Sequence, residues 1–300
     1  MVPGHEIAGI VKAVGSDVTK FKVGDCVGVG CFVDSCMSCE LCDRGEQNMC
    51  RTHVQTYSTN YPTGKGHDEC AGFHTNGGYS SEITVRSDFV FNLPEKLGME
   101  YAGPLLCAGI TMFSPLNRHV LEKGGKKKVG IVGFGGLGQV GTKLAKAMDS
   151  EAVIFSRSDS KKADAEALGA SLVAHTDEEA LKAVAYTCDV IIDTISHPHE
   201  VQHIMGSLKV GGTYVCIGGI AQPFNIVPFG MIFNNYKLEG SLVGGIPETQ
   251  KMLDFCAEKN VLPDIKVISA KEANDQFKAL GDGSASTVRA VIDMSTLSDL

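Results

Sequence analysis

A glycine-rich turn between an apolar strand and a helix constrains this chain more than any other feature. Residues 129–141 have the sequence VGIVGFGGLGQVG, and an amphipathic segment continues to Met148. The glycines match the pattern G-x-G-x-x-G at Gly133, Gly135 and Gly138. In that pattern the first glycine permits a tight turn, the second lets the backbone approach a pyrophosphate, and the third lets the helix pack on the strand. The stretch therefore predicts a dinucleotide site at a helix N-terminus, with a purely structural glycine turn as the alternative.

The composition fits a folded chain of two domains and argues against several classes of partner. The chain has 300 residues, 43% hydrophobic and 21% charged, with a net charge of −8. An acidic chain is not expected to bind nucleic acid. We find no apolar run long enough to span a membrane and no secretory signal. Eleven cysteines without such a signal favour metal ligands or free thiols over disulfides, so we expect a cytoplasmic protein.

From residue 128 onward, predicted strands alternate with predicted helices. We expect strands at 128–133, 151–156, 171–174, 188–194, 212–218 and 237–243, and helices at 137–149, 159–168, 177–186, 198–208 and 247–259. This alternation predicts an α/β fold with a parallel sheet covered on both faces, and six strands fit a doubly wound dinucleotide-binding domain. The preceding part is β-rich, with strands expected at 7–14, 23–29, 77–85 and 89–93 and a buried helical stretch at 101–115.

Four cysteines stand close together with the spacing C-x2-C-x2-C-x7-C: Cys36, Cys39, Cys42 and Cys50. Four thiolates suit a closed, structural zinc site. An iron–sulfur cluster is the competing metal, but the last gap has seven residues instead of three and no proline follows. Unligated thiols are the remaining alternative. Cys26, Cys31 and Cys70 lack ligand spacing, and we expect them to be buried as small apolar residues.

The end of the second predicted strand indicates which nicotinamide cofactor binds. An NAD site carries a carboxylate about 20 residues after the glycine run, where it accepts from the ribose 2′-hydroxyl. Here the place holds Ser156, Arg157 and Ser158, with Lys161 just beyond. Arginine can bind a phosphate with two hydrogen bonds, and lysine supplies a point charge. The sequence therefore favours NADP over NAD, with a solvated helix start capped by Asp159 as the alternative.

Several histidines and one further cysteine are ambiguous by themselves. His5 lies in the opening loop, and Cys107 lies in the buried helical stretch. Their simplest interpretations are a solvated turn histidine and a core cysteine. His53, His67 and His74 lie in the polar segment 51–80, which we expect to be a surface loop.

Motifs along the whole chain occur in a single order: PGHEIAGIV at 3–11, GDCVGVG at 24–30, the four cysteines, PLLCAGIT at 104–111, GFGGLG at 133–138, SRSDSKK at 156–162 and VRAVID at 288–293. With them the chain resembles the zinc-dependent medium-chain alcohol dehydrogenases, most of all the NADP-dependent cinnamyl-alcohol-dehydrogenase-like branch. The resemblance implies a GroES-like β-barrel catalytic domain at 1–113, returning at 249–300. It implies a Rossmann domain at 114–248 and a homodimer.

The resemblance also assigns the ambiguous residues. It implies that His5 and Cys107 are ligands of a catalytic zinc, and that Glu6 is a neighbouring carboxylate able to approach the metal. It places further residues at the cofactor: Thr111, Gly136, Leu137 and Arg289, with Ser241 in the stretch near the nicotinamide. The implied reaction is the reversible reduction of aldehydes to primary alcohols, aromatic or aliphatic, with NADP(H). A polyol or secondary-alcohol dehydrogenase is the alternative within the superfamily.

The family begins several dozen residues before Met1 of this chain. The resemblance places the second cysteine ligand of the catalytic zinc in that earlier segment. We therefore expect a barrel that is incomplete at the N-terminus, from a fragment or a late start codon. On this expectation the 300 residues bind one structural zinc, and the catalytic zinc belongs to a longer form. The alternative is a non-catalytic short form that binds NADPH and is stabilised by zinc.

Overall fold

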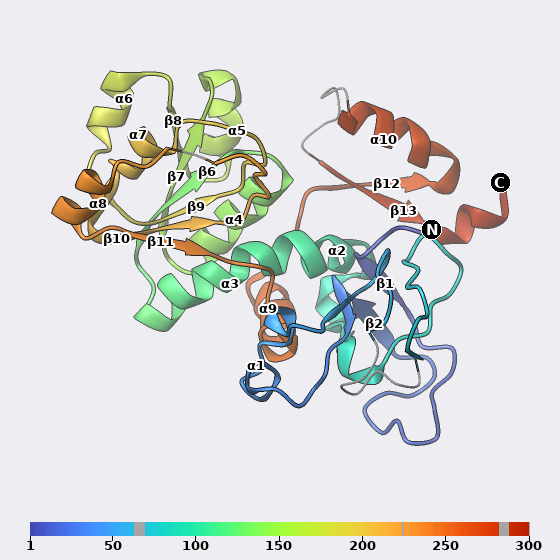
Figure 1. The fold of residues 1–300 in the computed structure, drawn as a ribbon. Coiled ribbons are helices and arrows are strands. Elements are labelled where there is room, and N and C mark those ends of the chain that lie inside the picture. Colours follow the sequence, from blue (N-terminus) through green and yellow to red (C-terminus); the bar gives the residue numbers. More distant parts are fainter. Residues whose placement is uncertain (63–69, 224, 282–287, 300) are drawn as a thin grey trace. The chain divides into compact units, whose positions relative to one another are not determined.

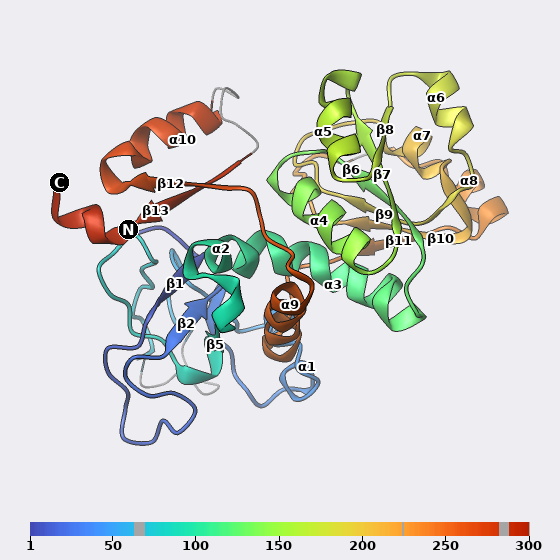
Figure 2. The same ribbon diagram turned by 180° about the vertical axis from the view of Figure 1, so that it is seen from behind.

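The computed structural model describes residues 1–62, 70–223, 225–281 and 288–299, which divide into two compact units (Figures 1 and 2). Unit 1 comprises Met1–Ile110 and Val243–Leu300, and unit 2 comprises Thr111–Leu242. The predicted α/β fold is confirmed: a parallel sheet with helices makes up unit 2, and small sheets with helices make up unit 1. His67 lies outside the described residues.

Unit 2 is built on a six-stranded sheet in which every pairing is parallel, with the order β11-β10-β9-β6-β7-β8 (Figure 1). The strands are β6 (Lys128–Val132), β7 (Glu151–Ser156), β8 (Ser171–Ala174), β9 (Cys188–Asp193), β10 (Leu208–Cys216) and β11 (Lys237–Gly240). Numbered within the sheet from β6, this is the 3-2-1-4-5-6 order of a dinucleotide-binding fold. The predicted doubly wound sheet is confirmed.

Helices cover both faces of this sheet: α3 (Ile110–His119, in unit 2 from Thr111), α4 (Gly136–Ala147), α5 (Lys162–Ala167), α6 (Glu178–Ala183), α7 (Val201–Met205) and α8 (Pro228–Asn234). Successive side chains of a strand point to opposite faces. On β6, Ile131 lies toward Gly138 of α4, and Val132 belongs to the buried cluster that includes Val201 and Ile204 of α7. Both β6 residues are fully buried, which explains the continuous apolar sequence of the strand.

The order of the sheet reverses between β6 and β9, and that is where ligands bind in such folds. The Thr194 backbone N–H donates to the Val132 carbonyl oxygen at 3.0 Å, which fixes the ends of these two strands side by side. The glycine turn leaves β6 at this same end, since Gly133 directly follows Val132. The fold thus places the predicted dinucleotide turn at the carboxyl edge of the sheet.

The described residues of unit 1 form three small sheets. The first is antiparallel with the order β1-β2-β5, the second is the antiparallel pair β3-β4, and the third is the parallel pair β12-β13. Their bounds are β1 (Ile7–Ile10), β2 (Cys26–Val29), β3 (Phe32–Asp34), β4 (Val54–Gln55), β5 (Val90–Asn92), β12 (Ile265–Ser269) and β13 (Arg289–Asp293). The sequence analysis did not predict β12 or β13 as strands.

The helices of unit 1 are α1 (Glu40–Asp43), α2 (Met99–Pro104), α9 (Ile246–Lys259) and α10 (Ala273–Gly281). Both ribbon views show α10 beside the pair β12 and β13 (Figures 1 and 2). Between α2 and α3 the backbone forms a π-helical turn, Leu105–Gly109, so the predicted helical stretch at 101–115 is confirmed. Among the described residues, none of the helices combines the length and apolar character required to cross a bilayer.

Two expectations about unit 1 are wrong. Residues 77–85 do not form a strand, because the N–H groups of Gly77, Gly78 and Tyr79 donate to carbonyls of the segment 2–4 instead of to a sheet. Cys26 and Cys70 are exposed, not buried. Of the three cysteines without ligand spacing, only Cys31 is partly buried.

The glycine turn yields a matched pair of variants. A Cβ at Gly138 would lie 2.2 Å from the Gly133 carbonyl oxygen, whereas a Cβ at Gly135 would meet nothing within 4 Å. We predict that Gly138→Ala lowers the free energy of unfolding by about 2 kcal/mol, or roughly 4–8 °C in melting temperature. Gly135→Ala should change stability by less than about 0.5 kcal/mol but weaken dinucleotide binding. Thermal melts and nucleotide titrations check this, and equal destabilisation by both variants would contradict it.

Candidate functional site

The N-terminus of α4 offers free backbone donors beside the glycine turn. Gly135 is the N-cap residue, and as a glycine it has no side chain to cap the first turn. Gly133 has a φ of +91°, a conformation that L side chains rarely adopt. Gly136 and Leu137, both predicted to contact cofactor, are the first residues of the helix. The backbone N–H groups of a first helical turn and the helix dipole favour a phosphate here.

The residues predicted to select NADP follow directly from the end of β7. Ser156 is the last residue of the strand, and Arg157 and Ser158 are exposed. Lys161 Nζ donates to the Phe134 carbonyl oxygen at 3.2 Å, which brings this lysine against the glycine turn. The side chains at this strand end are thus two hydroxyls and two cations, a set that suits a phosphate group.

Two further residues predicted at the cofactor lie elsewhere in unit 2. Thr111 is buried near the start of α3. Ser241 follows β11, and its hydroxyl accepts from Arg118 Nη2 at 2.9 Å. The same guanidinium is paired with Glu239 at 2.9 Å, so an ion pair between α3 and β11 holds Ser241 in place.

The structure brings the four closely spaced cysteines together in unit 1. The Sγ–Sγ distances are 3.5 Å for Cys36–Cys50, 3.6 Å for Cys39–Cys42 and 4.0 Å for Cys36–Cys42. A tetrahedron of sulfurs about 2.3 Å from zinc has edges of about 3.8 Å. A disulfide would instead bring the sulfurs to about 2.05 Å. The group therefore fits a closed zinc site made only of thiolates.

The surroundings of Cys36 and Cys42 shift the pKa values of these two thiols in opposite directions. The Ser38 backbone N–H donates to Cys36 and lowers the pKa of that thiol to about 6. Burial raises the pKa of Cys42 to about 11. Metal binding requires thiolates, so a zinc ion here must displace the proton of Cys42.

His5 and Cys107 are 102 positions apart in sequence and adjacent in the structure. His5 Nε2 lies 3.2 Å from Cys107 Sγ. His5 belongs to the loop before β1, where its ring stacks on Tyr57, and Cys107 is at the centre of the π-helical turn. Such turns are frequent at functional sites. The structure thus joins the two residues that the resemblance assigned to the catalytic zinc.

Cys31 is a member of this group that sequence reasoning did not select. The ligand atoms of His5, Cys31 and Cys107 all lie within 4.8 Å of one another. Cys31 lies between β2 and β3, and its contact with Cys107 is the main cause of the raised pKa of that thiol, followed by burial. The spacing carried no signal, because Cys31 stands five positions before Cys36 and joins a ligand group distant in sequence.

Glu6 is turned toward an arginine and is not part of this group. Its carboxylate accepts a hydrogen bond from Arg289 Nη2, in an ion pair whose side chains are both partly buried. Arg289, predicted at the cofactor, is the first residue of β13. The contact with Cys107 raises the pKa of His5, and the nearby Glu6 charge adds to this, while burial and Arg289 oppose it. The Arg289 charge thus partly offsets the effect of the carboxylate.

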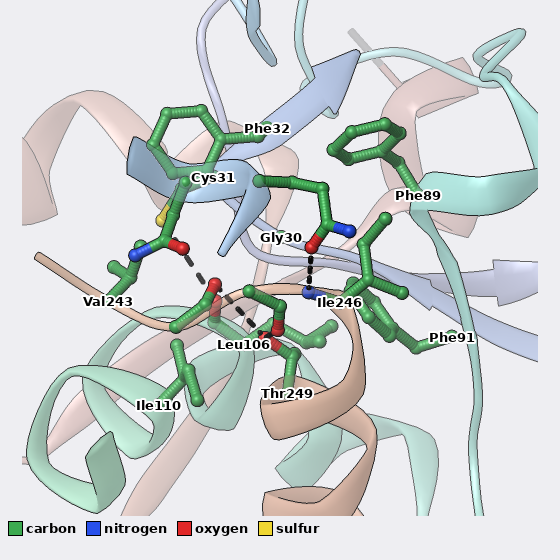
Figure 3. Close-up of a pocket in the computed structure, with 14 residues that line it drawn as sticks. Gly30, Cys31, Phe32, Phe89, Phe91, Leu106, Ile110, Val243, Ile246 and Thr249 are labelled. Atoms are coloured by element: carbon green, nitrogen blue, oxygen red, sulfur yellow. Dashed lines mark hydrogen bonds between the residues drawn. The ribbon is translucent and has the colours of Figure 1, made fainter. Parts of the chain in front are cut away.

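A small pocket within unit 1 is lined in part by Cys31, which lies close to His5 and Cys107 (Figure 3). Cys31 and Leu106 lie in its wall, together with the apolar side chains of Phe89, Ile110 and Val243. Gln47 Oε1 accepts a hydrogen bond from the Ile246 backbone N–H at 3.0 Å. The lining would favour an apolar ligand over a charged one.

Comparison with protein families covers both units. Residues 136–258 match the family described as zinc-binding dehydrogenase. Residues 1–95 match the alcohol dehydrogenase GroES-like domain.

Individual relatives cover nearly the whole chain. An NADP-dependent alcohol dehydrogenase of Mycolicibacterium smegmatis is 43% identical over 302 residues, 99% of this chain and 83% of that protein. The mannitol dehydrogenase of Petroselinum crispum is 44% identical over 283 residues, 93% of this chain and 81% of that protein.

Solved structures also resemble this chain. A cinnamyl alcohol dehydrogenase of Sorghum bicolor superposes with a TM-score of 0.91 at 38% identity, covering 98% of this chain and 82% of that one. CAD from Helicobacter pylori, solved in complex with NADP(H), has a TM-score of 0.87 at 38% identity, with the same coverage.

The four-cysteine group allows a test by metal removal. We predict that Cys39→Ser releases one zinc per chain and lowers the melting temperature, because the remaining thiolates no longer close the tetrahedron. Cys26→Ser is the matched control, since Cys26 is an exposed cysteine of the same unit. Zinc analysis and thermal melts of both variants decide. A Cys39→Ser protein that keeps its zinc and its melting temperature would rule out this zinc site.

Proposed function

This chain belongs to the zinc-binding alcohol dehydrogenase family, and from that premise we propose that it interconverts aldehydes and primary alcohols with NADP(H). The observation that carries the proposal is the 3.2 Å approach of His5 Nε2 to Cys107 Sγ. An imidazole nitrogen and a cysteine sulfur are the donor types of the catalytic zinc in alcohol dehydrogenases, where two cysteines and one histidine leave a fourth position open.

His5 and Cys107 are the residues that would hold the zinc. Bound zinc supplies Lewis-acid polarisation of the substrate oxygen, and NADPH supplies the hydride. Around them, Arg289 holds the Glu6 carboxylate in an ion pair, which limits the negative charge near the thiol. The apolar pocket walls at Phe89, Leu106 and Ile110 would exclude water and favour an apolar substrate.

NADP(H) is the cofactor that unit 2 suits. The end of β7 offers Ser156, Arg157 and Ser158, and Lys161 reaches the glycine turn. The pyrophosphate would bind at Gly135 and Gly136, where α4 begins. A CAD from Helicobacter pylori of the same fold was solved with NADP(H), which supports this choice.

Polyol oxidation is the second candidate reaction, because one relative at 44% identity is a mannitol dehydrogenase. Most of the side chains that line the pocket are apolar, with Gln47, Asn48 and Thr249 as the polar members, and this lining supports an aldehyde with an aromatic or aliphatic chain as the first choice. A protein that binds NADPH without catalysis is the alternative from another class.

We further propose a homodimer formed through the edge of the sheet. β11 is an edge strand, and α8, which contacts the neighbouring strand β10, exposes Phe229, Ile232 and Phe233 by 66%, 74% and 70%. Large exposed apolar patches mark interaction sites. A monomer mass in light scattering would contradict the dimer.

We also propose a cytoplasmic location. The free cysteines support it, because an oxidising compartment would favour their oxidation to disulfides.

The reaction is tested directly with the zinc-loaded 300-residue chain. We expect NADPH oxidation with cinnamaldehyde and with an aliphatic aldehyde, and much less with ketones. We expect slower NADP reduction with mannitol, since most of the side chains that line the pocket are apolar. Faster turnover of mannitol would favour the polyol reaction, and NADPH binding without turnover of any substrate would favour the non-catalytic alternative.

Arg157 tests the choice of cofactor. Arg157→Ala should weaken NADPH binding by about ten- to a hundredfold, the cost of one charge-assisted hydrogen bond, and leave NADH binding nearly unchanged. Only NADPH carries the 2′-phosphate. Lys182→Ala, on the exposed helix α6, is the control. Fluorescence titration with both nucleotides measures the effect, and equal losses for the two would refute the assignment.

A further inference from the structure

We propose that Cys31 is the third protein ligand of the zinc held by His5 and Cys107. The inference rests on the proposed function only in taking zinc as the metal. It replaces the expectation that these 300 residues bind a single zinc: with Cys31 the chain itself has a three-ligand site and should hold two zinc ions.

The distances allow all three side chains to reach one ion. Their ligand atoms lie within 4.8 Å of one another, and His5 Nε2 is 3.2 Å from Cys107 Sγ. Around tetrahedral zinc, neighbouring ligands are about 3.6 Å apart for nitrogen and sulfur and about 3.8 Å for two sulfurs. Shifts of about an ångström or less in flexible side chains would therefore close the site.

The backbone brings Cys31 to this position by close packing against the π-helical turn. A Cβ at Gly28 would lie 2.6 Å from the Leu106 side chain, and one at Gly30 would lie 3.0 Å from the Leu106 carbonyl oxygen. Glycines at these two positions let β2 and the residue after it pass close to the residue that precedes Cys107. The Thr56 backbone N–H donates to the Cys31 carbonyl oxygen at 3.0 Å and so holds the backbone of Cys31 in place after β2.

The donor set also matches the chemistry. One imidazole and two thiolates leave a fourth tetrahedral position open, as a catalytic zinc requires. Cys31 also lines the pocket in unit 1, which Figure 3 shows, so an ion held by it would adjoin the apolar pocket. The four-cysteine group has no such opening, because its own thiolates occupy every position.

Zinc content is the first test. The 300-residue chain should bind two zinc ions, and Cys31→Ala should bind one while keeping the ion of the four-cysteine group. Cys26→Ala, an exposed cysteine of β2, is the matched control and should keep two. One zinc in the unaltered chain, or two in a folded Cys31→Ala, would overturn the proposal.

A second measurement does not depend on the folding of Cys31→Ala. Cobalt loading of the unaltered chain and of His5→Ala, followed by alkylation with iodoacetamide and peptide mass spectrometry, reports whether the metal covers Cys31. We expect Cys31 to react about tenfold faster in His5→Ala, since alkylation needs a thiolate that the metal does not already hold. Cys26 should react equally fast in both. Equal rates at Cys31 would overturn the proposal, whatever the chain does with aldehydes.

Discussion

The contact between the His5 imidazole and the Cys107 thiol is the constraint on which unit 1 depends. It joins a loop and a π-helical turn that are 102 positions apart in the sequence. Gly28 and Gly30 lie close to Leu106 of that turn, because neither glycine has a side chain to keep the backbone away. Contact with Cys31 and burial together raise the pKa of Cys107 well above that of an ordinary thiol. Metal binding must therefore displace a proton from this site, which couples zinc affinity to pH.

Glycines also allow close backbone contacts in unit 2. Gly138 lets α4 lie against the Gly133 carbonyl, and the bare backbone at Gly135 leaves room for a ligand. The sheet supplies the rigid frame, since Ile131 and Val132 are buried on its two faces. In unit 2 the glycine turn follows a buried strand, whereas in unit 1 the candidate ligands lie in the loop before β1, between β2 and β3, and in the π-helical turn.

Much of this arrangement could be predicted from local pattern. The six parallel strands follow from the alternation of apolar runs with helical segments, and the four-cysteine group follows from its spacing. The strand predicted at 77–85 failed because the N–H groups of Gly77 and Gly78 find partners in the opening loop, which no local pattern encodes. The ligand and cofactor roles of individual residues stay predictions, resting on resemblance and on the geometry described.

Cys31 shows where sequence reasoning stops. A ligand group assembled from positions 5, 31 and 107 has no spacing to recognise, and only the packing of β2 on the π-helical turn brings the three together. The expected single zinc followed from the two ligands that resemblance could assign. Three-dimensional proximity adds a third donor and changes the expected metal content.

The most direct measurement is anomalous diffraction at the zinc absorption edge from crystals of the zinc-loaded 300-residue chain. The account predicts two peaks, one surrounded by the four cysteines and one bonded to His5, Cys31 and Cys107. A single peak at the four cysteines, or a second peak with Cys31 beyond bonding distance, would contradict it.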